Sequence, residues 1–239
     1  MPKRTKTISF YDLKSEFVRS HEPNPIIHQD YVQILDFAYS LAEQRIGAIL
    51  IDNTIAFWDL VVQRGQKREY EKTINISRPH SKIFYIEFNQ TWVTMDDLFN
   101  LNEWDILEQT SVRYGSKPVH TNILTDVVEL PQYEMIATSS LDKRIVMWEV
   151  TKRIARQIIN VPFMSVQQIV YTPDFRSLFT INTTNEIQIY TFDNESCFNV
   201  GVLDGHTSEV TAICALKGTS LLLSIDEFKF IKTWDIRDF

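Results

Sequence analysis

The sequence predicts an all-β protein built from about five repeated small sheets. Aromatic residues make up 12% of the chain, with 15 Phe, 9 Tyr and 5 Trp, and aromatic side chains pack well on pleated sheets. Short apolar runs also alternate with turn signals along most of the chain. We therefore expect short strands joined by tight turns.

An aromatic anchor recurs at an even spacing near the end of each repeat. The five anchors are Trp58, Trp104, Trp148, Tyr190 and Trp234. They are separated by 46, 44, 42 and 44 residues. A period of this length is typical of architectures in which each unit buries its sheet against the next unit. We interpret each period as one blade of a β-propeller.

The clearest internal match needs no gap. Residues 120–150 align with residues 206–236 at an offset of 86, so that His120 falls on His206 and Trp148 on Trp234. Within the last period the pattern predicts strands over 210–216, 220–225 and 229–236, with a turn at 217–219.

The segments LDGHTSEV (203–210) and IKTWDI (231–236) resemble the Gly-His to Trp-Asp unit of the WD40-repeat family. In that family a His, a Ser or Thr, an Asp and the Trp form a hydrogen-bonded set that locks the strands of a blade. The resemblance therefore implies two structural blade locks. They consist of His120, Ser140, Asp142 and Trp148 in the third blade and of His206, Ser224, Asp226 and Trp234 in the fifth. The fifth blade departs from the pattern, because its Asp lies eight rather than six residues before its Trp.

The repeats suggest an N-terminal extension (1–30) followed by the WD-repeat region (31–239). The expected blades cover approximately 31–75, 76–118, 119–160, 161–204 and 205–239. Members of the family usually close their ring with more blades than five, within the general range of about four to eight. Either residues 6–13 (KTISFYDL) supply a closing outer strand, or the five blades belong to a seven-blade or larger propeller in a longer protein. We favour the second explanation.

Composition argues against several classes of function. The net charge of −7 provides no basic surface for a phosphate backbone, so we expect no nucleic-acid partner. No apolar stretch approaches the roughly 18–20 residues of a membrane span, and no signal-peptide pattern is present. We therefore expect a cytoplasmic protein without membrane insertion.

The sequence also contains no pattern typical of catalysis. The chain has six Gly and no Gly-rich phosphate loop, and its five His form no ligand pair. Cys197 and Cys214 lie 17 residues apart, which is neither a zinc spacing nor a redox pair. We predict no catalytic residue, no metal, no cofactor and no small-molecule substrate.

The most charged segment, VQRGQKREYEK (62–72), lies between the first two blades. Its Arg64, Lys67, Arg68 and Glu69 form a candidate partner-binding loop, although a solvated connection is the plainer interpretation.

Together these patterns predict a non-catalytic scaffold that binds other proteins in a multi-subunit complex, because loops on a rigid frame usually carry such function. The alternative is a WD40 specificity receptor that reads a peptide or a modified residue, for example for a ubiquitin ligase. More narrowly, the first, second and fourth blades keep the family pattern only in part, and these degenerate blades together with the phrase IKTWDIRDF are similar to WD-repeat scaffold proteins of motile cilia. That resemblance implies a location in the axonemal cytoskeleton.

Overall fold

The computed structural model describes residues 33–60, 72–161, 164–193, 196–216 and 218–237. Within these ranges the chain forms 19 strands and two short 3-10 helices, Pro131–Tyr133 and Pro173–Phe175. This confirms the all-β prediction. No helix in the described part is long and apolar enough to cross a membrane.

The strands form five antiparallel sheets, numbered in chain order, in which each strand pairs with the next one along the chain. Sheet 1 contains β1 (Ile34–Ser40), β2 (Arg45–Leu50), β3 (Thr54–Asp59) and β4 (Lys72–Asn75). Sheet 2 contains β5 (His80–Ile86), β6 (Thr91–Asp96), β7 (Leu101–Asp105) and β8 (Thr110–Arg113). Sheet 3 contains β9 (Leu124–Leu130), β10 (Met135–Ser140), β11 (Arg144–Glu149) and β12 (Ile154–Asn160).

Sheet 4 contains β13 (Val166–Thr172), β14 (Ser177–Asn182), β15 (Ile187–Asp193) and β16 (Ser196–Leu203). Sheet 5 has three strands in the described residues, β17 (Val210–Ala215), β18 (Leu221–Asp226) and β19 (Ile231–Asp235). The last strand begins two residues later than the sequence pattern predicts. Lys229 has a φ of 69°, and Asp226 Oδ1 accepts a hydrogen bond from the Phe230 N–H at 2.9 Å, so both residues belong to the turn.

Tight turns recur at equivalent places in the sheets. Gln44, Gln90, Glu134 and Arg176 precede the second strands of sheets 1 to 4, with φ between 50° and 53°. This left-handed conformation usually favours Gly or Asn. The chain has only six Gly, and longer polar side chains occupy these four positions instead.

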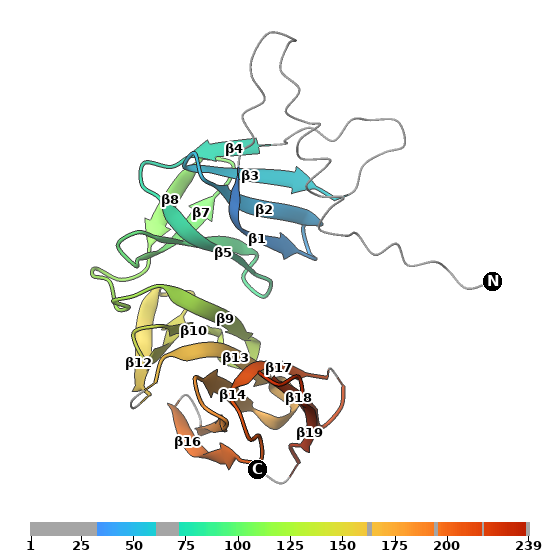
Figure 1. Ribbon diagram of the computed structural model, residues 1–239. Coiled ribbons are helices and arrows are strands. Elements are labelled where there is room, and N and C mark those ends of the chain that lie inside the picture. Colours follow the sequence, from blue (N-terminus) through green and yellow to red (C-terminus); the bar gives the residue numbers. More distant parts are fainter. Residues whose placement is uncertain (1–32, 61–71, 162–163, 194–195, 217, 238–239) are drawn as a thin grey trace, which may run out of the picture.

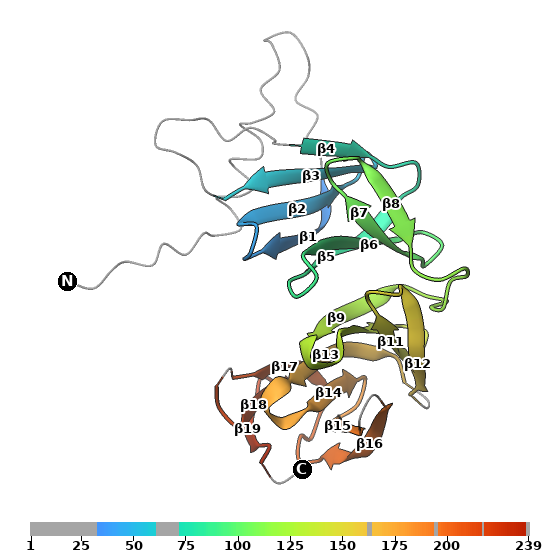
Figure 2. The same cartoon turned by 180° about the vertical axis from the view of Figure 1, so that it is seen from behind.

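The five sheets follow one another along an arc that is open on one side (Figure 1). The view from behind shows the same opening, with sheet 1 and sheet 5 at its two ends (Figure 2). The apolar core lies between successive sheets. At the joint between sheets 1 and 2, for example, Ile55 and Phe57 pack with Ile83 and Trp92, and all four side chains are buried.

Candidate functional site

A series of hydrogen bonds crosses sheet 3, from the loop before β9 to the third strand, β11. His120, which precedes β9, has Nε2 at 2.7 Å from Thr138 Oγ1 and Nδ1 at 3.0 Å from Asp142 Oδ2. Trp148 donates its indole N–H to the same Thr138 oxygen at 2.8 Å. A neutral His with its proton on Nδ1 satisfies every group in this chain, because Thr138 then donates to Nε2.

Thr138, rather than the predicted Ser140, bridges the His and the Trp. The register pairs Ile136 with Trp148, which places the indole diagonally across from Thr138. Ser140 lies at the end of β10, beyond the ring. Its hydroxyl bonds the Asn122 carbonyl and the Asp142 N–H, both at 3.1 Å, and so holds the turn that carries the Asp.

Sheet 5 brings together all four side chains named from its sequence. His206 Nε2 lies 2.6 Å from Ser224 Oγ, which accepts the Trp234 indole N–H at 2.8 Å. Its Nδ1 lies 2.9 Å from Asp226 Oδ2. Asp226, at the end of β18, therefore bonds Nδ1 of its His, as Asp142 does from a turn in sheet 3. The bond is kept although Asp226 lies eight rather than six residues before its Trp.

The carboxyl groups of Asp142 and Asp226 both have a pKa below the ordinary value. Burial is the largest single effect and would raise each pKa, but the hydrogen bond from the His and those from other donors together outweigh it. These other donors include backbone N–H groups, of Thr121 for Asp142 and of Phe230 for Asp226. Both Asp side chains are thus held as anions that orient a buried His.

The other sheets keep only parts of this series of hydrogen bonds. In sheet 2, His80 Nδ1 lies 2.6 Å from Thr94 Oγ1, which accepts the Trp104 indole N–H at 2.7 Å. The Asp96 carboxylate of this sheet accepts hydrogen bonds from the Asn100 and Asn102 side chains instead.

In sheet 4, Tyr190 replaces the Trp, and the buried Thr180 hydroxyl has no hydrogen-bond partner among the described residues. In sheet 1, Ala48 occupies the equivalent position. A Ser or Thr lies ten residues before the aromatic anchor in four of the five repeats, and its hydroxyl bridges the His and the Trp in three of them. Sequence reasoning missed this regularity, although the ten-residue spacing was available to find it. These sites are Thr94, Thr138, Thr180 and Ser224.

A second set of bonds joins one sheet to the next through their first strands. Asp36 Oδ2 accepts the Ile83 N–H at 2.9 Å, and Asp126 Oδ2 accepts the Ile169 N–H at 3.1 Å. Gln168 Oε1 accepts the Ile213 N–H at 2.9 Å. Burial raises the pKa of Asp36 and of Asp126 even though these N–H donors favour the ionised form.

The joint between sheets 2 and 3 is built differently. Lys82 occupies the position of the accepting residue there, and an ammonium group has no lone pair to offer. A bidentate pair joins these two sheets instead, with Arg153 Nε and Nη2 at 2.9 and 2.7 Å from the carboxylate oxygens of Glu103. Glu129 also accepts the Phe88 N–H at 3.3 Å.

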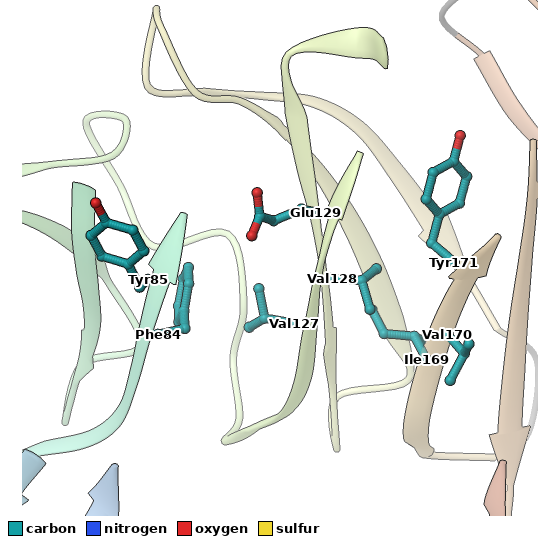
Figure 3. Close-up of a pocket in the computed structure, with 8 residues that line it drawn as sticks. All are labelled: Phe84, Tyr85, Val127, Val128, Glu129, Ile169, Val170 and Tyr171. Atoms are coloured by element: carbon teal, nitrogen blue, oxygen red, sulfur yellow. The ribbon is translucent and has the colours of Figure 1, made fainter. Parts of the chain in front are cut away.

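A pocket opens on the first strands of sheets 2, 3 and 4. Its volume is about 320 Å³, and its walls are mostly apolar. Tyr85 and Tyr171 stand at its two sides, with the Glu129 carboxylate between them (Figure 3). Burial raises the pKa of Glu129, and the charge of Glu87 raises it further. The lining consists of Phe84, Tyr85, Val127, Val128, Glu129, Ile169, Val170 and Tyr171.

The apolar walls of this pocket suit an apolar side chain of a partner. The carboxylate between the two aromatic rings suits a basic one. Such a pocket could not have been located from sequence, because its residues come from three repeats. The predicted partner-binding loop, with Arg64, Lys67, Arg68 and Glu69, lies outside the described residues. Within the described ranges, no group of three or more His, Cys, Asp and Glu side chains could hold a metal ion.

No family model matches the chain. In an alignment of 192 residues that covers 74% of the chain, the chain is 18% identical to Cilia- and flagella-associated protein 337 B of Tetrahymena thermophila. The chain is distantly similar to a protein associated, by its name, with cilia and flagella. The matched part is 15% of that protein, so the chain spans only a small share of its relative's length.

Proposed function

We propose that the five sheets are blades of a WD40-type β-propeller and that the protein is a non-catalytic interaction scaffold. The observation that carries this proposal is the repeated His–hydroxyl–Trp chain, present in full with its Asp in sheets 3 and 5. It fixes the strands of a sheet to one another and leaves the turns at both rims available for partners.

The polar groups that resemble catalytic residues are used for structure. His120 and His206 are buried, and both ring nitrogens of each engage neighbouring side chains. A general base needs a free nitrogen within reach of a substrate proton. These His therefore support a structural role, and we propose that the protein is not an enzyme.

We further propose that the protein acts in a multi-subunit complex of the cilium, in the axonemal cytoskeleton. The distant similarity to a cilia- and flagella-associated protein supports this setting. The pocket on sheets 2 to 4 is the proposed contact with one partner, through a basic side chain of that partner. An acidic peptide would meet the charges of Glu129 and Glu87, which disfavours the phosphopeptide form of the receptor alternative.

A tagged copy of the protein, expressed in a ciliated cell, tests this proposal. We expect it to sediment with axonemes and to purify with a fixed-ratio set of structural proteins. Glu129→Gln keeps the hydrogen-bond acceptor but removes the charge, so it should weaken recovery of one partner. Glu134→Gln, on an exposed turn next to the same strand, is the matched control. A protein that stays in the cytosol and purifies with ligase subunits would instead support the receptor alternative.

A further inference from the structure

The pocket on the first strands of sheets 2 to 4 contains a carboxylate for which the described residues provide no cation. Glu129 lines the pocket from β9, and its side chain points toward sheet 2, where Oε2 accepts the Phe88 N–H at 3.3 Å (Figure 3). Neither Glu129 nor the nearby Glu87 forms an ion pair within the described ranges. By contrast, Glu103 at the joint between sheets 2 and 3 pairs with Arg153 at 2.7 Å. The described part of the chain therefore leaves the negative charge of this pocket unpaired.

The surroundings of Glu129 disfavour its charge. The side chain is half-buried, and Val127 and Val128 contribute apolar walls on the same strand. Burial raises the pKa of Glu129, and the charge of Glu87 raises it further. A cation that enters the pocket would offset both effects, because an opposite charge at short range favours the ionised carboxylate. The pocket is therefore complementary to a positively charged side chain of another molecule.

Two aromatic rings in the pocket favour a guanidinium group over an ammonium group. Phe84 and Tyr171 are half-buried and line the pocket from β5 and β13. The Tyr171 hydroxyl donates to Gln132 Oε1 at 2.7 Å, which fixes the position of its ring. A guanidinium is planar, stacks on aromatic faces and is more weakly hydrated than an ammonium, so it loses less on entering apolar surroundings. An arginine side chain thus fits this lining better than a lysine side chain.

Most of the remaining lining is aliphatic. It consists of Val127 and Val128 on β9 and of Ile169 and Val170 on β13. The pocket volume of about 320 Å³ lies at the lower end of the roughly 300–1,000 Å³ that is usual for ligand pockets. Removing apolar surface from water is favourable for both molecules. The residue next to the arginine in the partner should therefore be apolar.

We propose that this pocket binds an arginine of a partner protein, flanked by an apolar residue, and that it selects arginine over lysine. The carboxylate of Glu129 forms an ion pair with the guanidinium group. The rings of Phe84 and Tyr171 and the aliphatic walls contact the apolar parts of the bound segment. This inference deepens the proposed function and rests on it, because it names the chemistry of the partner at the proposed contact.

An array of short acetylated peptides, probed with the full chain, tests the inference. The central residue of each peptide is arginine, lysine, citrulline or norleucine, and the flanking residues vary among serine, valine, leucine and phenylalanine. Citrulline keeps the shape of arginine without its charge. We expect arginine peptides with apolar neighbours to bind best. The matched lysine peptides should bind roughly threefold less tightly and the matched citrulline peptides roughly tenfold less tightly.

Glu129→Gln separates the charge of the carboxylate from its shape. The variant keeps an acceptor for the Phe88 N–H, so we expect it to fold, which thermal melting checks. Fluorescence anisotropy should show that it binds the best arginine peptide roughly tenfold less tightly but binds the citrulline peptide as the wild type does. Glu134→Gln, on the exposed turn after β9, is the matched control and should change either affinity by no more than about twofold.

Arginine peptides that bind no better than their lysine or citrulline counterparts would overturn the inference. A Glu129→Gln variant that weakens binding of both peptides equally would overturn it as well. The comparison with citrulline uses the wild-type chain, so it decides the matter even where the variant does not fold.

These outcomes are distinguishable from a failure of the proposed function. A protein that selects arginine peptides but stays in the cytosol would show that the ciliary setting is wrong, and the arginine site would stand. An array without selection for arginine, together with loss of a partner from Glu129→Gln in ciliated cells, would overturn the arginine ligand and leave the contact standing.

Discussion

Asp126 in sheet 3 accepts a hydrogen bond from the backbone N–H of Ile169 in sheet 4, at 3.1 Å. The same relationship joins Asp36 to Ile83 between sheets 1 and 2. Between sheets 4 and 5, Gln168 provides a neutral acceptor to Ile213. At these three joints the bond needs an acceptor but not a charge, which leads to a first prediction.

Asp126→Asn should change how stability depends on pH. Burial raises the pKa of Asp126 above its ordinary value of 3.8, so the folded protein holds this proton more tightly than the unfolded chain. The free energy of unfolding therefore falls as pH rises from 3.8 through the raised pKa. The variant lacks this loss, so relative to wild type it should gain stability between about pH 4 and pH 7.

Urea unfolding at these two pH values measures the effect. Gln168→Glu is the converse variant, because it adds a carboxyl at the equivalent position and should introduce a new loss of stability with rising pH. Parallel pH profiles for wild type and Asp126→Asn would show that this carboxyl titrates as it does in the unfolded chain.

Thr138→Val should destabilise the protein by about 1–3 kcal/mol, the usual cost of leaving buried polar groups unpaired. The substitution removes the oxygen that receives the Trp148 N–H and that lies against His120. Thr138→Ser is the control, since Ser224 fills the same role in sheet 5. Chemical denaturation compares the two, and a loss for Thr138→Val no larger than that for Thr138→Ser would mean that the hydroxyl contributes no more than the methyl group.

Thr180→Val should have the opposite sign at the equivalent position of sheet 4. The Thr180 hydroxyl is fully buried and has no hydrogen-bond partner within the described ranges, because Tyr190 replaces the Trp. An apolar group of the same shape avoids the cost of burying it, so stability should be unchanged or rise by up to about 1 kcal/mol. A clear loss in the same denaturation assay would indicate that this hydroxyl is hydrogen-bonded in solution.

The two thiols should differ in reactivity in the folded protein. Cys197 is 2% exposed, and burial raises the pKa of its thiol to about 12, so little thiolate forms near neutral pH. Cys214 is exposed. Alkylation monitored by intact mass should add one group to the native protein and two after unfolding in denaturant. Rapid double labelling of the native protein would contradict the buried environment of Cys197.

The distant relative and the repeat pattern bear on different parts of the proposed function. The similarity to a cilia- and flagella-associated protein concerns the setting, while the repeated hydrogen-bond chain concerns the frame that presents partners. Axonemal co-sedimentation therefore tests the setting, whereas denaturation of Thr138→Val tests the frame.

The sequence alone determined the number of repeats and most of their strands, because the aromatic anchors and apolar runs are local signals with a fixed period. The resemblance to the WD40 family placed His206, Ser224, Asp226 and Trp234 in one set, and the structure joins these four side chains directly. The same resemblance predicted Ser140 in place of Thr138 as the bridging residue of sheet 3, because spacing along the chain does not show which side chain lies diagonally across from a Trp.

Only the tertiary structure decided how the sheets meet. The bond from Asp126 to Ile169, the pocket around Glu129 and the exposure of Ile231 all depend on which sheet lies beside which. Ile187 and Ile231 occupy the same place in their repeats, yet the first is buried and the second exposed. A repeated sequence fixes the shape of each unit, but the burial of a residue depends on the neighbouring sheet, and no sheet follows sheet 5 in the described part of the chain.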